Sequence, residues 1–230
     1  MPTKPLVSTL SLLAATVLAT SCSRPADTAE RWVAKELAFE STVSYENPYT
    51  DVDFRAVFEN ERGETLARPG FWDGGDTWKI RFAPPADGAS WTYETFSSDV
   101  QNEGLHGVSG RLAVQSYDGE NALLRHGLLR ISESGRSVLH ADGTPFLMVA
   151  DTPWALPFRA TEETARVYAQ NRQERGFNAA LLMSVQPDRN AEGPRERGLA
   201  GSFGRAFEDL SEGSLNRLNP EYFQHLDALI

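Results

Sequence analysis

Three side chains able to contact a ligand follow directly after an apolar run in the second half of the chain. The run spans residues 146–150, and Asp151, Thr152 and Trp154 come next. An unbroken apolar run between turn residues is typical of a strand buried on both faces. In α/β enzymes, ligands bind at the carboxyl ends of such strands. The alternative is structural, with Asp151 capping a turn and Trp154 packed in the core.

A helix and a second apolar strand follow this first strand. Thr161 is a suitable N-cap for a helix that continues to Arg175, and Gly176 suits the position after its end. Residues 177–185 form the next apolar run. A helical crossover of this length predicts that the two strands are parallel, with their carboxyl ends at the same edge.

Polar residues after the second strand are therefore candidates for the same site. Gln186 stands at its end, and Asp188 follows with the alternative of a solvated loop residue. The loop that they open is long, polar and glycine-rich, and such loops are usually functional or disordered. A last helix is predicted to begin at Pro220. Its apolar residues are spaced for a buried face: Phe223, Leu226 and Ile230.

The first half of the chain alternates apolar and polar residues, as β-strands with one buried face do. The segments with this pattern are 52–58, 78–82, 91–95 and 108–114. Turn residues separate them. Short strands at this spacing predict an antiparallel, immunoglobulin-like β-sandwich over residues 32–117. The chain is thus expected to be multidomain, with a β part followed by an α/β part.

Four sequence blocks lie in order within this half. They are Asn47-Pro-Tyr, Pro69-Gly-Phe-Trp-Asp-Gly, Trp78-Lys-Ile-Arg-Phe-Ala-Pro and Gly88-Ala-Ser-Trp-Thr-Tyr. Together they resemble the N-terminal sandwich module called domain of unknown function 5060, which commonly precedes a glycosidase-like barrel.

The aromatic residues of these blocks have two possible roles. They could fill the sandwich core or stack on the C–H face of a sugar ring. Trp78 and Trp91 lie in alternating strands, which favours the core. Phe71 and Trp72 lie in a predicted turn, and for them both roles stay open.

The N-terminus has the pattern of an export signal. Lys4 precedes an apolar run that is too short to span a membrane as a helix, and the run leads to Cys22. Residues 18–22 resemble a bacterial lipobox, which implies a lipoprotein signal peptide over residues 1–22 and lipidation of Cys22. The alternative is an ordinary signal peptide cleaved near Ala19.

A polar tether is expected after the signal, over residues 23–31. Ser23 favours the outer membrane in a Gram-negative cell. We therefore expect an exported protein, lipid-anchored through Cys22, in the outer membrane or periplasm. Because Cys22 is the single cysteine of the chain, no intramolecular disulfide is predicted.

Composition narrows the possible partners. The formal net charge of the 230 residues is −10, whereas binding to nucleic acid needs concentrated Lys and Arg, so no nucleic acid partner is predicted. The histidines have no paired spacing, so no metal site is predicted and no cofactor is implied. The oligomeric state is not indicated by the sequence.

Four further blocks lie in order in the second half. They are Asp142-Gly-Thr-Pro-Phe, Ala150-Asp-Thr-Pro-Trp, Gly176-Phe-Asn and Asn219-Pro-Glu-Tyr-Phe-Gln-His-Leu-Asp. Together they resemble the beginning of the apiosidase-like catalytic domain, domain of unknown function 4038, associated with glycoside hydrolase family 140. The resemblance implies a (β/α)₈ TIM barrel that cleaves glycosidic bonds in plant-type, pectic polysaccharides. It implies substrate contact, rather than catalysis, by Asp151, Thr152, Trp154 and Gln186.

The length of the second half limits this expectation. A complete barrel takes about 250 residues, whereas about 105 follow Arg125. Glycoside hydrolysis needs two carboxyl groups about 5–10 Å apart, and in such barrels later strands supply them. We therefore expect residues 126–230 to be an incomplete barrel with exposed apolar strand surface. The catalytic pair is expected beyond Ile230.

Two functions are consistent with these patterns. The first is a secreted, lipid-anchored glycoside hydrolase acting on pectic polysaccharide or oligosaccharide, of which this chain is an N-terminal fragment that is inactive alone. The second is a non-catalytic, carbohydrate-binding surface lipoprotein in which the sandwich does the binding. Both predict a carbohydrate partner and a membrane reached through the lipid on Cys22.

Overall fold

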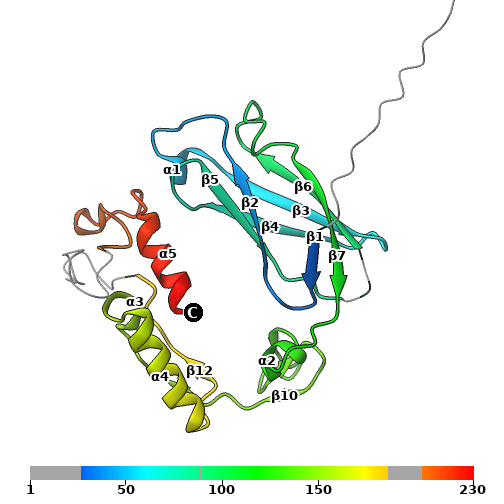
Figure 1. Cartoon of the computed structure of the whole chain (residues 1–230), viewed down its shortest axis with the longest axis vertical. Helices are drawn as coiled ribbons and strands as arrows, with labels where there is room; N and C mark the ends of the chain where they lie inside the picture. The colour runs from blue at the N-terminus through cyan, green and yellow to red at the C-terminus, as the bar shows by residue number, and fades with distance from the viewer. Residues whose placement is uncertain (1–26, 87, 89, 186–203) are drawn as a thin grey trace, which may run out of the picture.

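The computed structural model describes residues 27–86, 88, 90–185 and 204–230. Its first part is a curled seven-stranded sheet (Figure 1), with strand order β1-β7-β6-β3-β4-β5-β2. The strands are β1 (Asp27–Glu30), β2 (Lys35–Glu40), β3 (Phe54–Asn60), β4 (Thr65–Trp72), β5 (Thr77–Phe82), β6 (Ser90–Ser97) and β7 (Ser109–Gln115). A short helix, α1 (Pro48–Asp51), connects β2 with β3. All neighbouring pairs are antiparallel except β1 and β7.

The strand β4 makes this sheet fold over into two layers. Residues 65–69 pair with β3, whereas residues 70–72 pair with β5. At the change of partner, a Cβ on Gly70 would lie 2.1 Å from the ring of Phe54. Glycine is therefore favoured there, because a side chain would collide with the buried ring of Phe54 on the neighbouring strand β3. The result is a nearly closed β-sandwich.

Alternating side chains fill the space between the layers. Phe54, Ala56 and Phe58 point inward from β3 and are buried. The ring of Phe58 stacks on that of Phe82 with centroids 3.9 Å apart, which joins the two layers. The expectation that two tryptophans belong to the core is confirmed: Trp78 is 3% exposed and Trp91 is fully buried.

Three strands of the sandwich were not expected from the sequence. The polar segment Asp27–Glu30, expected as part of a tether, is β1, and it is held by parallel hydrogen bonds to β7 and by burial of Ala29 in the sandwich core. The strand β2 was not identified either. Phe71 and Trp72 close β4 and do not lie in a turn. Pro69 and Gly70 have the composition of a turn, but they mark the change of partner inside one strand.

The second part begins after β7 with α2 (Ala122–Arg125). An antiparallel sheet follows, with β8 (Leu129–Ile131), β9 (Val138–His140) and β10 (Pro145–Phe146). Two parallel strands, β11 (Ala150–Asp151) and β12 (Ala179–Ala180), flank α3 (Leu156–Arg159) and α4 (Glu162–Glu174). The 3₁₀ turn η1 (Leu210–Glu212) and α5 (Pro220–Leu229) complete the described chain.

The predicted crossover helix is confirmed as α4. Thr161 is its N-cap, and Thr161 and Thr164 form a reciprocal capping box. Gly176 has φ +82°, the left-handed conformation that ends helices and favours glycine. Since β11 and β12 pair in parallel on either side of α4, the strand–helix–strand arrangement is as expected.

The apolar run before Asp151 is not one strand buried on both faces. Leu147, Met148 and Val149 lie between β10 and β11 and are 80%, 51% and 37% exposed. In the described chain β11 pairs only with β12. Exposed apolar surface was expected for an incomplete barrel. Of the residues expected on the buried face of the last helix, Leu226 is buried and Phe223 is partly buried, whereas Ile230, just after α5, is 86% exposed. The other buried residues of α5 are Tyr222 and His225.

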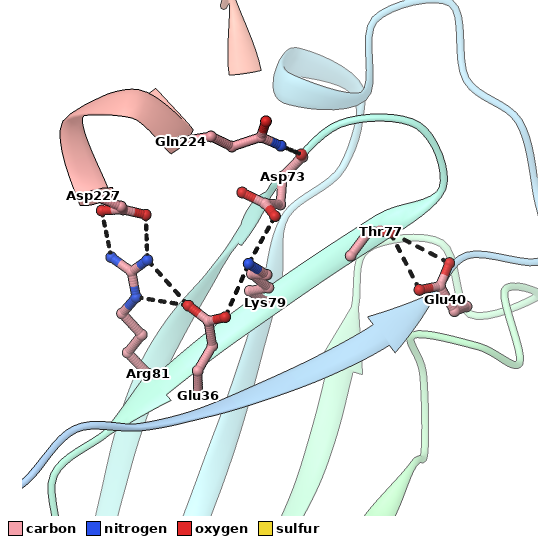
Figure 2. Close-up of polar contacts among 8 residues, drawn as sticks. All are labelled: Glu36, Glu40, Asp73, Thr77, Lys79, Arg81, Gln224 and Asp227. Atoms are coloured by element: carbon pink, nitrogen blue, oxygen red, sulfur yellow. Dashed lines mark hydrogen bonds and ion pairs between the residues drawn. The ribbon is translucent and has the colours of Figure 1, made fainter. Parts of the chain in front are cut away.

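An ion-pair network joins α5 to the sandwich (Figure 2). Arg81 of β5 donates from Nη1 to Asp227 Oδ1 at 3.1 Å and from Nη2 to the second oxygen of the same carboxylate. The Nε of Arg81 donates to Glu36 of β2 at 3.1 Å. Lys79 connects Glu36 with Asp73, at 2.9 and 2.8 Å. One arginine thus binds carboxylates from both parts of the chain.

Electrostatics within the network favours the charged forms. The hydrogen bond from Arg81 to Asp227 outweighs burial and raises the pKa of Arg81. Asp73, and then Glu36, raise the pKa of Lys79. Burial alone would raise the pKa of Glu36, but hydrogen bonds from Lys79 and Arg81 hold it below its ordinary value.

Neutral contacts reinforce the junction. Gln224 of α5 donates from Nε2 to the backbone oxygen of Asp73 at 2.6 Å (Figure 2). Asn47, just before α1, donates from Nδ2 to the backbone oxygen of Asn216 at 2.9 Å.

None of the helices in the described part of the chain combines the length and apolar character needed to span a membrane.

The substitution Arg81→Gln is expected to loosen α5 from the sandwich, because it removes the paired hydrogen bonds to Asp227. Partly exposed pairs contribute about 0.5–1 kcal/mol, so amides of α5 should exchange with deuterium roughly two- to fivefold faster. Arg111→Gln is the matched control, since Arg111 pairs with Glu61 on the sandwich surface. Equal deuterium exchange rates of the α5 amides in the two variants would show that Arg81 does not hold α5 against the sandwich.

Candidate functional site at the carboxyl ends of the parallel strands

The short strands β11 and β12 are extended by hydrogen bonds outside the two paired residues. Leu181 N–H donates to Asp151 O at 2.9 Å, and Met183 N–H donates to Trp154 O at 3.1 Å. The chain beyond each strand therefore stays alongside its neighbour. This keeps the residues that follow β11 beside those that follow β12, at one edge of the pair.

A side chain extends the same pairing in the other direction. Asn178 accepts a hydrogen bond from Val149 N–H at 2.8 Å and donates from Nδ2 to Leu147 O at 2.8 Å. Its own N–H donates to Val149 O at 2.9 Å. The amide of Asn178 thus takes the place of a backbone peptide group and holds the exposed apolar segment against β12.

The carboxylate of Asp151 faces α4. Oδ1 accepts the N–H of Thr152 at 2.7 Å. Oδ2 accepts the hydroxyl of Tyr168 at 2.9 Å and Nη1 of Arg172 at 3.1 Å. Three donors therefore fix the carboxylate, and Asp151 joins β11 to the helix that covers it. A contact between Asp151 and a substrate stays a prediction.

The same donors set the ionisation of Asp151. The N–H of Thr152, followed by the hydroxyl of Tyr168 and the charge of Arg172, holds the pKa of Asp151 below its ordinary value. Burial, together with the bond to Asp151, raises the pKa of Tyr168. At neutral pH this arrangement is an ionised carboxylate facing a guanidinium and a protonated phenol.

Arg172 also contacts aromatic rings. Its guanidinium lies 5.6 Å from the ring centroid of Tyr168 and 5.3 Å from that of Phe177. Its Nε–H is buried and has no hydrogen-bond acceptor among the described residues. Tyr168 and Arg172 are four residues apart on α4, so they lie on one face of the helix. That spacing was the sequence signal that could have identified them as partners of Asp151.

The other predicted site residues lie in the same region or outside the described residues. Thr152 is exposed, and Trp154, just after β11, is 48% exposed and so is not in a core formed by the described residues. Gln186 and Asp188 lie outside the described residues, as does Cys22. The structure thus brings together Asp151, Thr152 and Trp154 and leaves the contribution of Gln186 a prediction.

An apolar cluster supports this edge from one side. It is formed by buried residues from α3, from α5 and from the chain before α5: Phe158, Ala206, Phe207, Leu210 and Tyr222. Met183 and Val185, after β12, pack against it. The hydroxyl of Tyr222 has no hydrogen-bond partner in the described chain, and burial raises its pKa to about 12. The described ranges contain no group of three or more His, Cys, Asp or Glu placed to hold a metal ion.

Models of known families match both parts of the chain. The model of domain of unknown function 5060 matches residues 28–98, and the model described as apiosidase-like, catalytic domain, matches residues 132–230. Both resemblances are confirmed. The apiosidase-like domain therefore contains β11, α4 and β12, with Asp151 and Trp154 at the strand ends.

One solved structure is similar to this chain over most of its length, including both the sandwich and the apiosidase-like part. The chain is similar to the crystal structure, at 1.80 Å, of a "putative glycoside hydrolase" from Bacteroides vulgatus ATCC 8482, with 27% sequence identity and a TM-score of 0.67. The match covers 88% of this chain and 39% of that protein, so the chain spans about two fifths of its relative. A comparison with curated proteins finds no match. The similarity supports a general resemblance to glycoside hydrolases.

The substitution Asp151→Asn is expected to lower the midpoint of urea unfolding at pH 7, because it removes the charge that Arg172 faces. The folded-state pKa of Asp151 is depressed, so its stabilisation is present above the ordinary value of 3.8 and is lost as the pH falls through the folded value. The difference between the parent chain and the variant should therefore shrink in acid.

Glu163→Gln is the control for this prediction. Glu163 pairs with Arg166 on the same helix, but its side chain is 74% exposed. The substitution Glu163→Gln should therefore change the midpoint of urea unfolding little. A midpoint unchanged by Asp151→Asn would show that the contacts of Asp151 do not stabilise the fold. A difference that persists undiminished in acid would show that the charge of Asp151 is not the cause of the stabilisation.

Proposed function

We propose that the chain is the front portion of a glycoside hydrolase that acts on pectic polysaccharide or oligosaccharide. The observation that carries the proposal is the match of residues 132–230 to the apiosidase-like catalytic domain. The parallel unit of β11, α4 and β12 supports it, because a (β/α)₈ barrel begins with such a unit. In this proposal β11 and β12 are the first two barrel strands.

The described strand ends supply binding rather than catalysis in this proposal. Trp154 offers an exposed ring on which a sugar can stack, and Thr152 offers a hydroxyl beside it. Asp151 is engaged by Thr152, Tyr168 and Arg172, so its part is to hold the strand end in place. The acid and the base or nucleophile are proposed to come from later barrel strands in the whole enzyme.

Release of sugar tests this assignment. The 230-residue chain is expected to release no sugar from pectic oligosaccharides, whereas a longer protein with the remaining barrel strands should do so. Trp154→Ala in the longer protein should raise KM, since loss of stacking in a subsite costs about 1 kcal/mol or more. Tyr117→Ala, distant in sequence and outside the apiosidase-like domain, is the control. Turnover by the 230-residue chain itself would refute the assignment of the catalytic pair.

We further propose that the enzyme is exported and anchored to a membrane by lipid on Cys22. The lipobox-like sequence before Cys22 supports this proposal. Cys22→Ser is expected to abolish incorporation of labelled palmitate and to move the protein from the detergent phase to the aqueous phase. Ser23→Ala keeps the cysteine and should leave both properties unchanged. Detergent partitioning that survives Cys22→Ser would contradict lipidation at this residue.

A second candidate function is carbohydrate binding without catalysis. The observation that favours it is a cleft with aromatic side chains at the junction of the sandwich and α5. A longer protein that binds pectic oligosaccharides but hydrolyses none of them would favour this alternative over the enzyme.

A further inference from the structure

A cleft of about 450 Å³ lies between the sandwich and α5, within the range of about 300–1,000 Å³ typical of small-ligand sites. The sandwich side is formed by α1, the start of β3, the end of β4 and part of β5, and α5 forms the opposite side. The side chains on which the argument rests are Tyr49, Asp53, Phe71, Trp72, Arg81 and Phe223. We propose that this cleft binds a neutral oligosaccharide.

Aromatic rings give the cleft surfaces on which sugar rings can stack. Tyr49 is 41% exposed and packs against Phe207, with ring centroids 5.7 Å apart. Phe71, Trp72 and Phe223 are partly buried, so each keeps some accessible surface. Pyranose and furanose rings have apolar C–H faces that can pack on such side chains.

The rings are held in position by neighbouring groups. Trp72 donates from Nε1 to the backbone oxygen of Gly75 at 2.8 Å, which fixes its indole. The guanidinium of Arg81 lies 4.9 Å from the ring centroid of Phe71. Because Arg81 also binds Asp227 of α5, the same residue fixes the distance across the cleft (Figure 2). A ligand therefore meets surfaces that are already ordered, which lowers the entropy lost on binding.

Two polar groups in the cleft are available to hydrogen-bond a ligand. The carboxylate of Asp53 and the hydroxyl of Tyr49 have no hydrogen-bond partner among the residues that the structure describes. Asp53 accepts and Tyr49 both accepts and donates, which suits the hydroxyl groups of a sugar. An apolar wall with a few polar groups is the usual composition of a small-ligand site.

The charges of the cleft decide between neutral and acidic sugars. Asp53, Asp73 and Asp227 line it, and Arg81 is the basic side chain among its described lining residues. The guanidinium of Arg81 already binds Asp227 and Glu36. A galacturonate carboxylate would meet negative charge without a free cation, so neutral sugars are favoured over acidic ones.

Calorimetric titration of the whole 230-residue chain tests the proposal. The probes are neutral arabino- and galacto-oligosaccharides of about six units, which roughly match such a cleft in size, with oligogalacturonate as the acidic counterpart. The neutral probes are expected to bind, and oligogalacturonate at least about tenfold more weakly. No binding of either neutral probe, or equal binding of the acidic one, overturns the proposal.

Variants locate the binding. Phe71→Ala should weaken binding about fivefold or more, as expected for the loss of one aromatic contact. Phe96→Ala is the matched control, because Phe96 is another partly buried phenylalanine of the sandwich that lies beneath an arginine, Arg55, at 5.4 Å. Binding that both variants weaken equally would place the sugar elsewhere.

A second pair of variants keeps the test decisive if Phe71→Ala fails to fold. Tyr49 and Asp53 are exposed, so Tyr49→Ala and Asp53→Ala should fold and each should weaken binding. Unchanged affinity in both overturns the proposal. The readout is binding without turnover, so its failure is distinct from that of the proposed hydrolase, which is measured by sugar release from the longer protein.

Discussion

Arg81 is the residue on which the relation between the two parts of the chain depends. Its guanidinium binds Glu36 within the sandwich and Asp227 on α5, a residue 146 positions later in the sequence. The side chains of Arg81 and Asp227 are each 41% exposed, so water screens their attraction and the pair adds modestly to stability. The two parallel hydrogen bonds to Asp227 act mainly on orientation, because they fix the plane of the carboxylate relative to the sheet. Together with the bond from Gln224 to Asp73, this contact sets how α5 lies against the sandwich and so contributes to the shape of the cleft.

Side chains compensate for the small parallel sheet of the apiosidase-like domain. Its strands β11 and β12 pair over two residues each, which is too little to hold two segments together. Asn178 adds hydrogen bonds before the pair, and Asp151 connects its end to α4 through Tyr168 and Arg172. The strand end is thereby rigid before any ligand arrives. Trp154, which follows, is presented on an ordered support while its own side chain stays accessible.

The sequence predicted correctly those strands, caps and turns that depend on residues close together in the chain. The alternation around Phe58 and Trp78, the cap at Thr161 and the glycine at 176 depend on neighbouring residues, and the structure confirms them. The partner of a strand depends on residues far away. For that reason β1 was taken for a tether, and Phe71 and Trp72 were taken for a turn when they end β4 after its change of partner. The direction of the Asp151 side chain could not be predicted either, because a strand of two residues is too short to show an alternation of apolar and polar residues.

The parallel pairing of β1 with β7 has a mechanical consequence. Asp27 opposes Leu112 and Glu30 opposes Gln115, so the chain enters β1 at one end of the pair and leaves β7 at the other. A pull on the amino end of β1 and an opposite pull on the carboxyl end of β7 would act along the two strands in opposite directions. The hydrogen bonds between them would then be loaded together in shear rather than broken one after another. This four-residue strand is therefore placed to resist tension applied between the amino end of the sandwich and the region that follows β7.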